Sequence, residues 1–215
     1  MIPLYHDFTD ETVLIFGGGP VGARKARRFA REARVVVVSP EFAETAYGTA
    51  ELVRAAPTAE EVDSWFDRVA PALAVAATDD ERVNDAVETS ARERGVLVNR
   101  ADRAGGREFG SVVVPATVRD GSVVVSVSTG GASPALSKVL RERIEADIEG
   151  AGELAALTAE LRAELKARGV PPAARRAAVR DVVSSEAVWK GLGTGSSNAR
   201  RKADAVVEAA LGEHE

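Results

Sequence analysis

Three glycines, Gly17, Gly19 and Gly22, form a G-x-G-x-x-G pattern that could hold the phosphates of a dinucleotide. In such a loop the first glycine permits a tight turn, the second lets a pyrophosphate approach the bare backbone, and the third lets a helix pack closely on a strand. A helix beginning near Pro20 would also direct unpaired N–H groups and the positive end of its dipole at the phosphates. The motif alone is weak evidence, because glycine-rich turns also occur for packing reasons.

The residues on either side of the glycines predict the elements that such a loop needs. Residues 13–16 are four apolar residues in a row, which is typical of a strand buried on both faces. Residues 23–30 carry apolar side chains at helical spacing. The glycines therefore connect a predicted strand to a predicted helix, which is the setting of a dinucleotide-binding loop.

A second apolar run, residues 35–38, ends in Ser39, Pro40 and Glu41. Dinucleotide-binding domains hold the adenosine ribose with an acidic or small polar residue at the tip of this strand, roughly 20 residues beyond the glycines. Glu41 therefore favours NAD over NADP, and no arginine lies at the tip itself to take a 2′-phosphate. Ser39 and Pro40 could equally begin a helix, and both interpretations can hold together.

Predicted strands and helices continue to alternate up to residue 99. Three further apolar runs predict strands, at residues 51–55, 73–77 and 96–99. The alternation predicts an α/β fold with a Rossmann-type, doubly wound parallel sheet and right-handed crossovers. Ligands bind such sheets beyond the carboxyl ends of the strands, where the glycine loop, Ser39, Thr78 and Asn99 would meet.

The pattern changes beyond residue 110. Two β-rich runs, 111–118 and 122–128, flank an Asp-Gly pair typical of a hairpin turn, and Ser133 and Pro134 begin a predicted helix. A hairpin and one helix bury too little apolar surface alone, so they must pack on the first domain or on a second subunit. We expect three parts, which are a Rossmann-type domain at 1–110, a hairpin-helix unit at 111–149, and a small helical C-terminal region at 150–215 with a flexible linker near 191–198.

The composition of the 215 residues limits the classes of function. A net charge of −5 argues against a general nucleic-acid binder. The absence of cysteine excludes disulfides and thiolate catalysis, and two histidines cannot form a histidine cluster, so we expect no resident metal site. Apolar runs fall far short of the roughly 18 residues of a membrane span. We expect a soluble, cytoplasmic protein with no membrane or nucleic-acid partner.

Four ordered motifs carry a resemblance to a known family. They are Gly17–Gly22 followed by Lys25-Ala26, Ala76-Ala77-Thr78-Asp79-Asp80, Val98-Asn99 followed by Asp102, and Ser128-Thr129-Gly130-Gly131-Ala132-Ser133-Pro134. In this order and spacing the chain resembles the precorrin-2 dehydrogenase family, the dehydrogenase/ferrochelatase module of sirohaem synthases. The resemblance covers about residues 1–150, and the remainder resembles only a generic helical tail. Together the four motifs are far more specific than the glycine loop alone.

The resemblance implies an activity and an assembly. Family members use NAD⁺ to oxidise precorrin-2 to sirohydrochlorin, and some also insert Fe²⁺ to give sirohaem. Nothing in the sequence separates a member that only oxidises from one that also inserts metal. The family's dimer is built through the hairpin-helix unit, so the resemblance implies a homodimer with the apolar face of the 134–148 helix at or near the interface.

The resemblance also implies roles for individual residues. Asp102 matches the family's essential aspartate, and a carboxylate near the nicotinamide is a suitable acceptor for the proton that must leave with the hydride. The expected cofactor-binding residues are Gly17, Gly19, Pro20, Val21, Gly22, Ser39, Glu41, Phe42, Thr78 and Asp79. The expected substrate-binding residues are Asn99, Arg103, Arg107, Ser128, Thr129, Gly130 and Lys138. Basic residues, Arg100 and Arg141 among the further candidates, would pair with the substrate's carboxylates.

The chain departs from the family's common form at two positions. The usual Ser-Ser before Gly-Gly is Ser128-Thr129, which keeps both hydroxyls. Arg103 follows Asp102 where many relatives have a small residue and proline, which changes the expected shape of the substrate loop. The methyltransferase domain fused to some sirohaem synthases has no counterpart in the 215 residues, so we expect another protein to methylate uroporphyrinogen.

Two other classes of protein share part of this pattern. A regulatory NAD-binding module, such as the cytoplasmic domains of potassium transporters, would have the glycine loop and buried strands but would not need Asp102. A tetrapyrrole-binding protein without catalysis would keep the fold and tolerate replacement of Asp102 by alanine.

Overall fold

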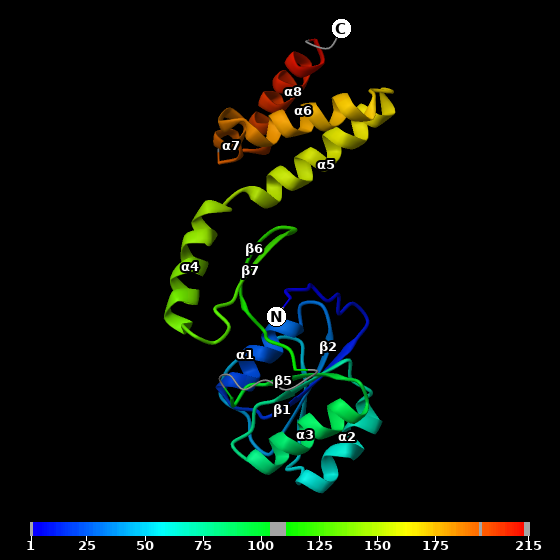
Figure 1. Ribbon diagram of the computed structural model, residues 1–215, viewed down its shortest axis with the longest axis vertical. Coiled ribbons are helices and arrows are strands. Elements are labelled where there is room, and N and C mark those ends of the chain that lie inside the picture. Colours follow the sequence, from blue (N-terminus) through cyan, green and yellow to red (C-terminus); the bar gives the residue numbers. More distant parts are fainter. Residues whose placement is uncertain (1, 104–110, 194, 213–215) are drawn as a thin grey trace. The chain divides into compact units, whose positions relative to one another are not determined.

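The computed structural model describes residues 2–103, 111–193 and 195–212. The chain divides into two compact units, Met1–Val114 and Pro115–Glu215 (Figure 1). The first boundary predicted from the sequence, at 110/111, lies close to this division. The further separation of 111–149 from 150–215 stays a prediction.

The first unit contains a five-stranded sheet in the order β3-β2-β1-β4-β5, and every pair of neighbours is parallel. The strands are β1 (Thr12–Phe16), β2 (Arg34–Ser39), β3 (Glu51–Arg54), β4 (Leu73–Ala76) and β5 (Leu97–Arg100). Phe16 lies opposite both Val38 and Ala76, so the three central strands end at the same edge. The predicted Rossmann-type parallel sheet is confirmed.

Helices cover both faces of this sheet, because alternate side chains of each buried strand point to opposite faces. Leu14 and Phe16 of β1 pack with one apolar cluster, which includes side chains of α2 (Val62–Val69) and α3 (Glu81–Glu93). Val13 and Ile15 pack with the other, which includes Ala23 and Ala26 of α1 (Pro20–Phe29). A short 3-10 helix, Ala59–Glu61, precedes α2. The core therefore holds the carboxyl ends of the strands in fixed positions.

The second unit begins with an antiparallel hairpin of β6 (Ala116–Asp120) and β7 (Val123–Val127), followed by α4 (Pro134–Asp147). Gly121 occupies the turn with a φ of 53°, a conformation that favours glycine. The Ser133 hydroxyl accepts a hydrogen bond from the Leu136 backbone N–H at 3.2 Å and caps α4. The predicted hairpin and the predicted helix are therefore both present.

Four helices complete the second unit: α5 (Ala151–Ala167), α6 (Pro172–Ser184), α7 (Glu186–Leu192) and α8 (Ser196–Gly212). They share one buried apolar cluster, to which Leu157, Val182 and Val207 belong. The flexible linker predicted near 191–198 is wrong in extent, because α7 continues to Leu192 and α8 begins at Ser196. Gly191 is a packing residue of α7, since a Cβ there would lie 2.9 Å from the Ala199 Cα. Among the described residues, no helix is both long and apolar enough to span a bilayer.

Candidate functional site

The glycine loop connects β1 to α1, and two of its glycines are required by close backbone contacts. Gly17 has a φ of 114°, and a Cβ there would lie 2.2 Å from the Ala77 carbonyl oxygen. A Cβ on Gly22 would lie 1.9 Å from the Gly17 carbonyl oxygen. Both distances are far below van der Waals contact, so these residues allow the turn and the close packing of α1.

Gly19 has a different environment from Gly17 and Gly22. Its backbone is extended, with a φ of −74°, and a Cβ there would meet no protein atom within 4 Å. It immediately precedes Pro20, the first residue of α1, and it borders an open cavity. Bare backbone thus faces empty space at a helix N-terminus, which fits the approach of a pyrophosphate.

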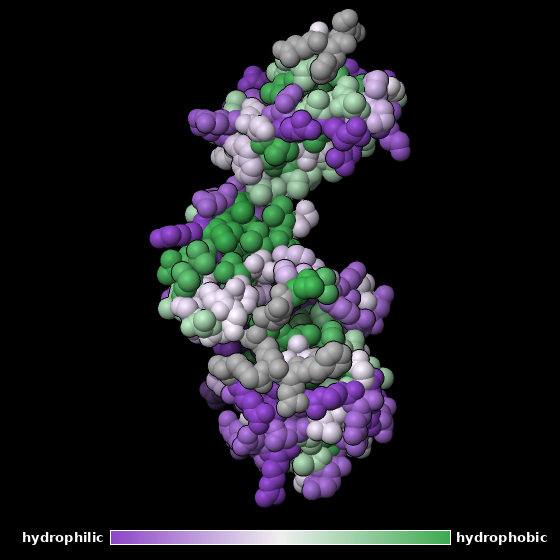
Figure 2. All heavy atoms as spheres, in the orientation of Figure 1, coloured by the Kyte–Doolittle hydropathy of each residue, from purple (hydrophilic) through white to green (hydrophobic). Residues whose placement is uncertain are grey.

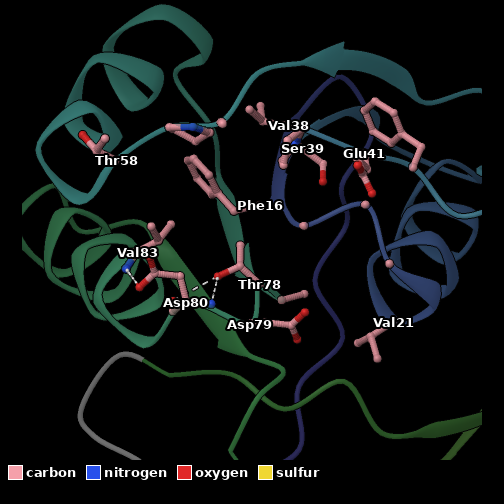
Figure 3. A pocket seen from close by; sticks show the side chains of 18 of the residues that line it. Phe16, Val21, Val38, Ser39, Glu41, Thr58, Thr78, Asp79, Asp80 and Val83 are labelled. Carbon is pink, nitrogen blue, oxygen red and sulfur yellow. Dashed lines mark hydrogen bonds between the residues drawn. The ribbon is translucent and has the colours of Figure 1, made fainter.

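The cavity has a volume of about 950 Å³ and lies at the carboxyl edge of the sheet (Figure 3). This volume lies in the range of ligand sites. Nine of the ten expected cofactor-binding residues line it: Gly17, Gly19, Pro20, Val21, Ser39, Glu41, Phe42, Thr78 and Asp79. The tenth, Gly22, is buried beneath the loop and contributes through packing. The residues present therefore fit a dinucleotide.

Thr78 is held in place by Asn84, a residue that the sequence did not single out. Asn84 is 1% exposed, and its side-chain oxygen accepts hydrogen bonds from the Thr78 backbone N–H at 3.2 Å and the Thr78 hydroxyl at 2.8 Å. Its amide nitrogen donates to the Thr78 carbonyl oxygen at 2.9 Å. The sequence contained one indication of this role: Asn84 is a polar residue next to Val83, on the face of the predicted helix that is buried.

Tyr47 connects the segment after β2 to the glycine loop by hydrogen bonds. Sequence reasoning did not identify this residue. The Tyr47 hydroxyl donates to the Gly18 carbonyl oxygen and accepts from the Ala43 backbone N–H at 3.0 Å. A Cβ on Gly18 would lie 2.3 Å from the Glu41 carbonyl oxygen. Because the loop and the strand tip contact each other so closely, the phosphate and ribose ends of the cavity are positioned together.

An arginine reaches the tip of β2 from the neighbouring strand. Arg54 lies opposite Ser39 in the register of β2 and β3, and its guanidinium donates to the Pro40 carbonyl oxygen at 3.0 Å. The same group lies 5.7 Å from the centroid of the Phe42 ring. The expectation that no arginine lies at the tip holds for β2 itself. Sheet pairing nevertheless brings a cation to the tip.

Asp102 follows β5 and forms a two-point ion pair with Arg100. The Arg100 Nε donates to the Asp102 Oδ1 at 2.9 Å, and Nη2 donates to Oδ2 at 2.7 Å. These bonds hold the pKa of the Asp102 carboxyl below its usual range, and the charge of Arg103 acts in the same direction. Asp102 is therefore ionised at neutral pH. It is not among the residues that line the cavity.

Asn99 lies on β5 and is 6% exposed, and only one of its two side-chain polar atoms has a hydrogen-bond partner in the described residues. Its amide nitrogen donates to the Val112 carbonyl oxygen at 2.7 Å. Its side-chain oxygen and the Ser111 hydroxyl have no hydrogen-bond partner within the described ranges. An unsatisfied buried acceptor costs about 1–3 kcal/mol, which a ligand that donates a hydrogen bond could recover.

The other expected substrate-binding residues are distributed over both units. Arg103 belongs to the first unit and pairs with Glu81 at 2.7 Å and Asp85 at 3.1 Å. Arg107 lies outside the described residues. The other four, Ser128, Thr129, Gly130 and Lys138, belong to the second unit.

The Thr129 hydroxyl has a structural task within the second unit. It accepts a hydrogen bond from the Ser133 backbone N–H at 3.2 Å and lies 3.1 Å from the Ser137 hydroxyl. The serine-to-threonine departure thus retains a hydroxyl that organises the start of α4. A substrate role for residues 128–130 stays a prediction.

Comparisons with known proteins agree with this geometry. A family model described as NAD(P)-binding matches residues 4–116, and one described as "Sirohaem biosynthesis protein central" matches residues 120–147. The chain is 32% identical to a precorrin-2 dehydrogenase of Methanosarcina barkeri, in an alignment covering 98% of this chain and 95% of that protein. It is 37% identical to a sirohaem synthase of Stutzerimonas stutzeri, covering 99% of this chain but only 46% of that protein.

A solved structure of SirC, a precorrin-2 dehydrogenase, shares the fold. The TM-score is 0.69 at 22% sequence identity, and the alignment covers 97% of this chain and all of that one. The chain therefore spans nearly the full length of the dehydrogenases that it matches and less than half of the sirohaem synthase.

Proposed function

The chain belongs to the family of precorrin-2 dehydrogenases and sirohaem synthases, and we propose that it oxidises precorrin-2 to sirohydrochlorin with NAD⁺. The observation that carries the proposal is the match to a precorrin-2 dehydrogenase over nearly the whole length of both chains. The cavity beside Gly19 supplies the dinucleotide site that this reaction requires. NAD⁺, when bound, accepts the hydride that leaves the substrate.

The cavity residues bind and orient the cofactor. The N-terminus of α1 and the bare backbone at Gly19 bind the pyrophosphate, and Glu41 accepts hydrogen bonds from the adenosine ribose hydroxyls. Thr78 and Asp79 form the edge of the site at the end of β4 (Figure 3). The Asn84 side chain holds Thr78 in place through the hydrogen bond from the Thr78 hydroxyl. The Glu41 carboxylate favours NAD⁺ over its 2′-phosphorylated form because it would repel a phosphate, and the Arg54 guanidinium at the same strand tip offsets part of that repulsion.

Asp102 acts as the proton acceptor. Oxidation of precorrin-2 breaks one C–H bond with loss of a hydride and releases one proton, which must go to a base. The Arg100 ion pair occupies one lone pair on each Asp102 oxygen and leaves the others available. The ionised carboxylate can therefore receive the proton.

The substrate's carboxylates are bound by basic side chains. Arg103 is 42% exposed and can exchange its surface partners Glu81 and Asp85 for a substrate carboxylate. Lys138 on α4 is 74% exposed and lies 4.0 Å from Glu142, and a substrate role for it stays a prediction. Asn99 is buried and does not line the cavity, and its expected role in substrate binding stays a prediction.

An anaerobic assay with enzymatically generated precorrin-2 tests the activity directly. With NAD⁺ we expect NADH and sirohydrochlorin in equal amounts, and with NADP⁺ a kcat/KM lower by about two- to fivefold, since the exposed Glu41 carboxylate would repel the 2′-phosphate through solvent-screened charge. NAD⁺ binding without any NADH formation would contradict the proposal and favour a regulatory or scaffold role.

Iron insertion is tested in the same assay. Fe²⁺ is added to the sirohydrochlorin product with and without the protein, and enzymatic formation of sirohaem is followed by its absorbance. The similarity to sirohaem synthases supports this second step as part of the proposal. The use of NAD⁺ agrees with a cytoplasmic location, which stays a prediction.

We further propose that two copies associate through α4. Leu136 and Val139 on α4 are 49% and 43% exposed, and apolar side chains gather over α4 and the hairpin (Figure 2). An exposed apolar helix face favours association with another surface. The resemblance to the family implies that this other surface belongs to a second copy of the chain. The family model of the central domain matches residues 120–147, which include α4.

Replacing Leu136 and Val139 together by aspartate is expected to convert the homodimer to monomers at micromolar concentration, because two charges would have to be buried. Light scattering coupled to size exclusion measures the mass. Val183→Asp is a matched control, since Val183 is 44% exposed on α6 and lies outside this face. A monomeric wild-type protein, or a double variant that remains dimeric, would rule out this interface.

A further inference from the structure

Arg100, the last residue of β5, is an almost fully buried arginine surrounded by carboxylates. Its side chain is 7% exposed. Nε and Nη2 bond to Asp102, and Nη1 bonds to Asp85 at 2.7 Å and to Glu88 at 2.8 Å. Four of the five guanidinium N–H donors are therefore in use. Arg100, a candidate for the substrate's carboxylates from sequence alone, is committed to carboxylates of its own chain.

The geometry of the pair leaves Asp102 little freedom. Two parallel N–H···O bonds fix both the position and the plane of a carboxylate. Arg100 itself is fixed from two sides, since it ends a core strand and its Nη1 is bound by two carboxylates of α3. Asp102 lies beyond the end of β5, so Arg100 is the group that connects its carboxylate to the rigid part of the first unit.

We propose that Arg100 is a positioning residue for Asp102: its two parallel hydrogen bonds hold the carboxylate in one orientation, ready to receive the substrate's proton. This inference rests on the proposed function of Asp102 as proton acceptor. Arg100 does not touch the substrate in this role and acts only through Asp102.

The charges around Asp102 determine the sign of the expected pH effect. Arg100 and Arg103 both lower the pKa of the Asp102 carboxyl, whereas its partial burial raises that pKa. Asp85, Glu88 and Glu81 of α3 face the two arginines and offset part of their positive charge. Removing Arg100 takes away the largest cause that lowers the pKa of Asp102 and leaves only a backbone hydrogen bond and the charge of Arg103 to oppose burial, so that pKa is expected to rise.

Kinetics of Arg100→Gln and Arg100→Lys against pH test the proposal. For Arg100→Gln we expect the acid limb of kcat/KM to move up by about one pH unit or more, and kcat at neutral pH to fall by about ten- to a hundredfold. Arg100→Lys keeps a positive charge but loses the two-point geometry, so we expect a similar loss of kcat and a smaller movement of the acid limb. NAD⁺ affinity is expected to change by less than about twofold, because Asp102 does not line the cavity.

Arg94→Gln is the matched control. Arg94 also pairs with two carboxylates, Asp63 at 2.7 Å and Asp67 at 3.2 Å, but it contacts neither Arg100 nor Asp102. We expect its pH profile to be that of the wild type. Circular dichroism and thermal unfolding establish that each variant is folded. If Arg100→Gln does not fold, the same measurements are made on Arg100→Lys, because that variant retains the positive charge opposite Asp85 and Glu88.

A folded Arg100→Gln or Arg100→Lys variant with the pH profile and kcat of the wild type would overturn the proposal. A lower kcat with an unmoved acid limb in both variants would show that Arg100 is merely structural. The double variant Arg100→Gln, Asp102→Asn is expected to be no slower than Asp102→Asn alone. If Asp102→Asn is itself fully active, the proposed function of Asp102 has failed, and that outcome is distinct from a failure of the Arg100 proposal.

Discussion

Replacing Asp102 by asparagine is expected to lower kcat for precorrin-2 oxidation by about two to four orders of magnitude, the usual contribution of a general base. Asparagine has the shape of aspartate but cannot take up a proton. Its amide nitrogen would also face an Arg100 N–H, so one of the two hydrogen bonds at 2.7–2.9 Å would be lost. NADH formation under anaerobic conditions measures the effect.

The control for this variant is Asp67→Asn. Asp67 is a 72% exposed aspartate that pairs with Arg94 at 3.2 Å, far from the carboxyl edge of β4 and β5, and its loss should leave kcat unchanged. NAD⁺ affinity should also stay the same in Asp102→Asn, because Asp102 does not line the cavity. Unchanged turnover of precorrin-2 by Asp102→Asn would disprove the assignment of the base.

Gly22→Ala is expected to lower the stability of the protein, whereas Gly19→Ala is expected to lower its affinity for NAD⁺. A Cβ at Gly22 would lie 1.9 Å from the Gly17 carbonyl oxygen, so the loop and α1 must move apart. Overpacking of this kind costs about 3 kcal/mol of unfolding free energy, which corresponds to a fall in Tm of roughly 6 °C or more. A Cβ at Gly19 meets no protein atom within 4 Å, so Gly19→Ala should unfold at the wild-type temperature.

The defect of Gly19→Ala is expected in cofactor binding instead. Its methyl group would occupy the space through which the pyrophosphate approaches the backbone, so the Kd for NAD⁺ should rise by about tenfold or more, or about 1.4 kcal/mol. Thermal unfolding and calorimetric titration of both variants separate the two effects. Wild-type NAD⁺ affinity in Gly19→Ala would show that the dinucleotide does not cross the loop at this residue.

The environments of these glycines also indicate how much of the motif could be interpreted from the sequence. The spacing of Gly17, Gly19 and Gly22 predicted one turn residue, one residue facing phosphate and one packing residue. Gly17 and Gly22 have the expected close backbone contacts, Gly19 has open space beside it, and its contact with phosphate stays a prediction. Gly18 was not assigned a role, although a Cβ there would lie 2.3 Å from the Glu41 carbonyl oxygen. That contact joins two segments distant along the chain, so local spacing contains no sign of it.

The local elements and their order could be predicted from residue patterns alone. Runs such as residues 13–16 and 35–38 are apolar at every position, which is stable only in strands covered on both faces, so the parallel sheet followed directly. Because the strands are parallel, their carboxyl ends lie at one edge of the sheet. Gly19, Ser39 and Thr78 line one cavity at that edge. The strands and helices themselves depend on neighbours a few residues apart, and side-chain patterning records such neighbours. Their parallel pairing was inferred from the strand-helix alternation.

The pairing of polar groups, in contrast, depends on how the elements pack together. Arg100 bonds to Asp85 and Glu88 of α3, Tyr47 bonds to Gly18 of the glycine loop, and Arg54 reaches Pro40 across a strand pair. An arginine is equally compatible with a substrate carboxylate and with a carboxylate of its own chain, because the chemistry of the two pairs is the same. Packing of β5 against α3 removes Arg100 from solvent and places its partners within hydrogen-bond distance, and that choice is made by folding, since no residue next to Arg100 in the sequence specifies it.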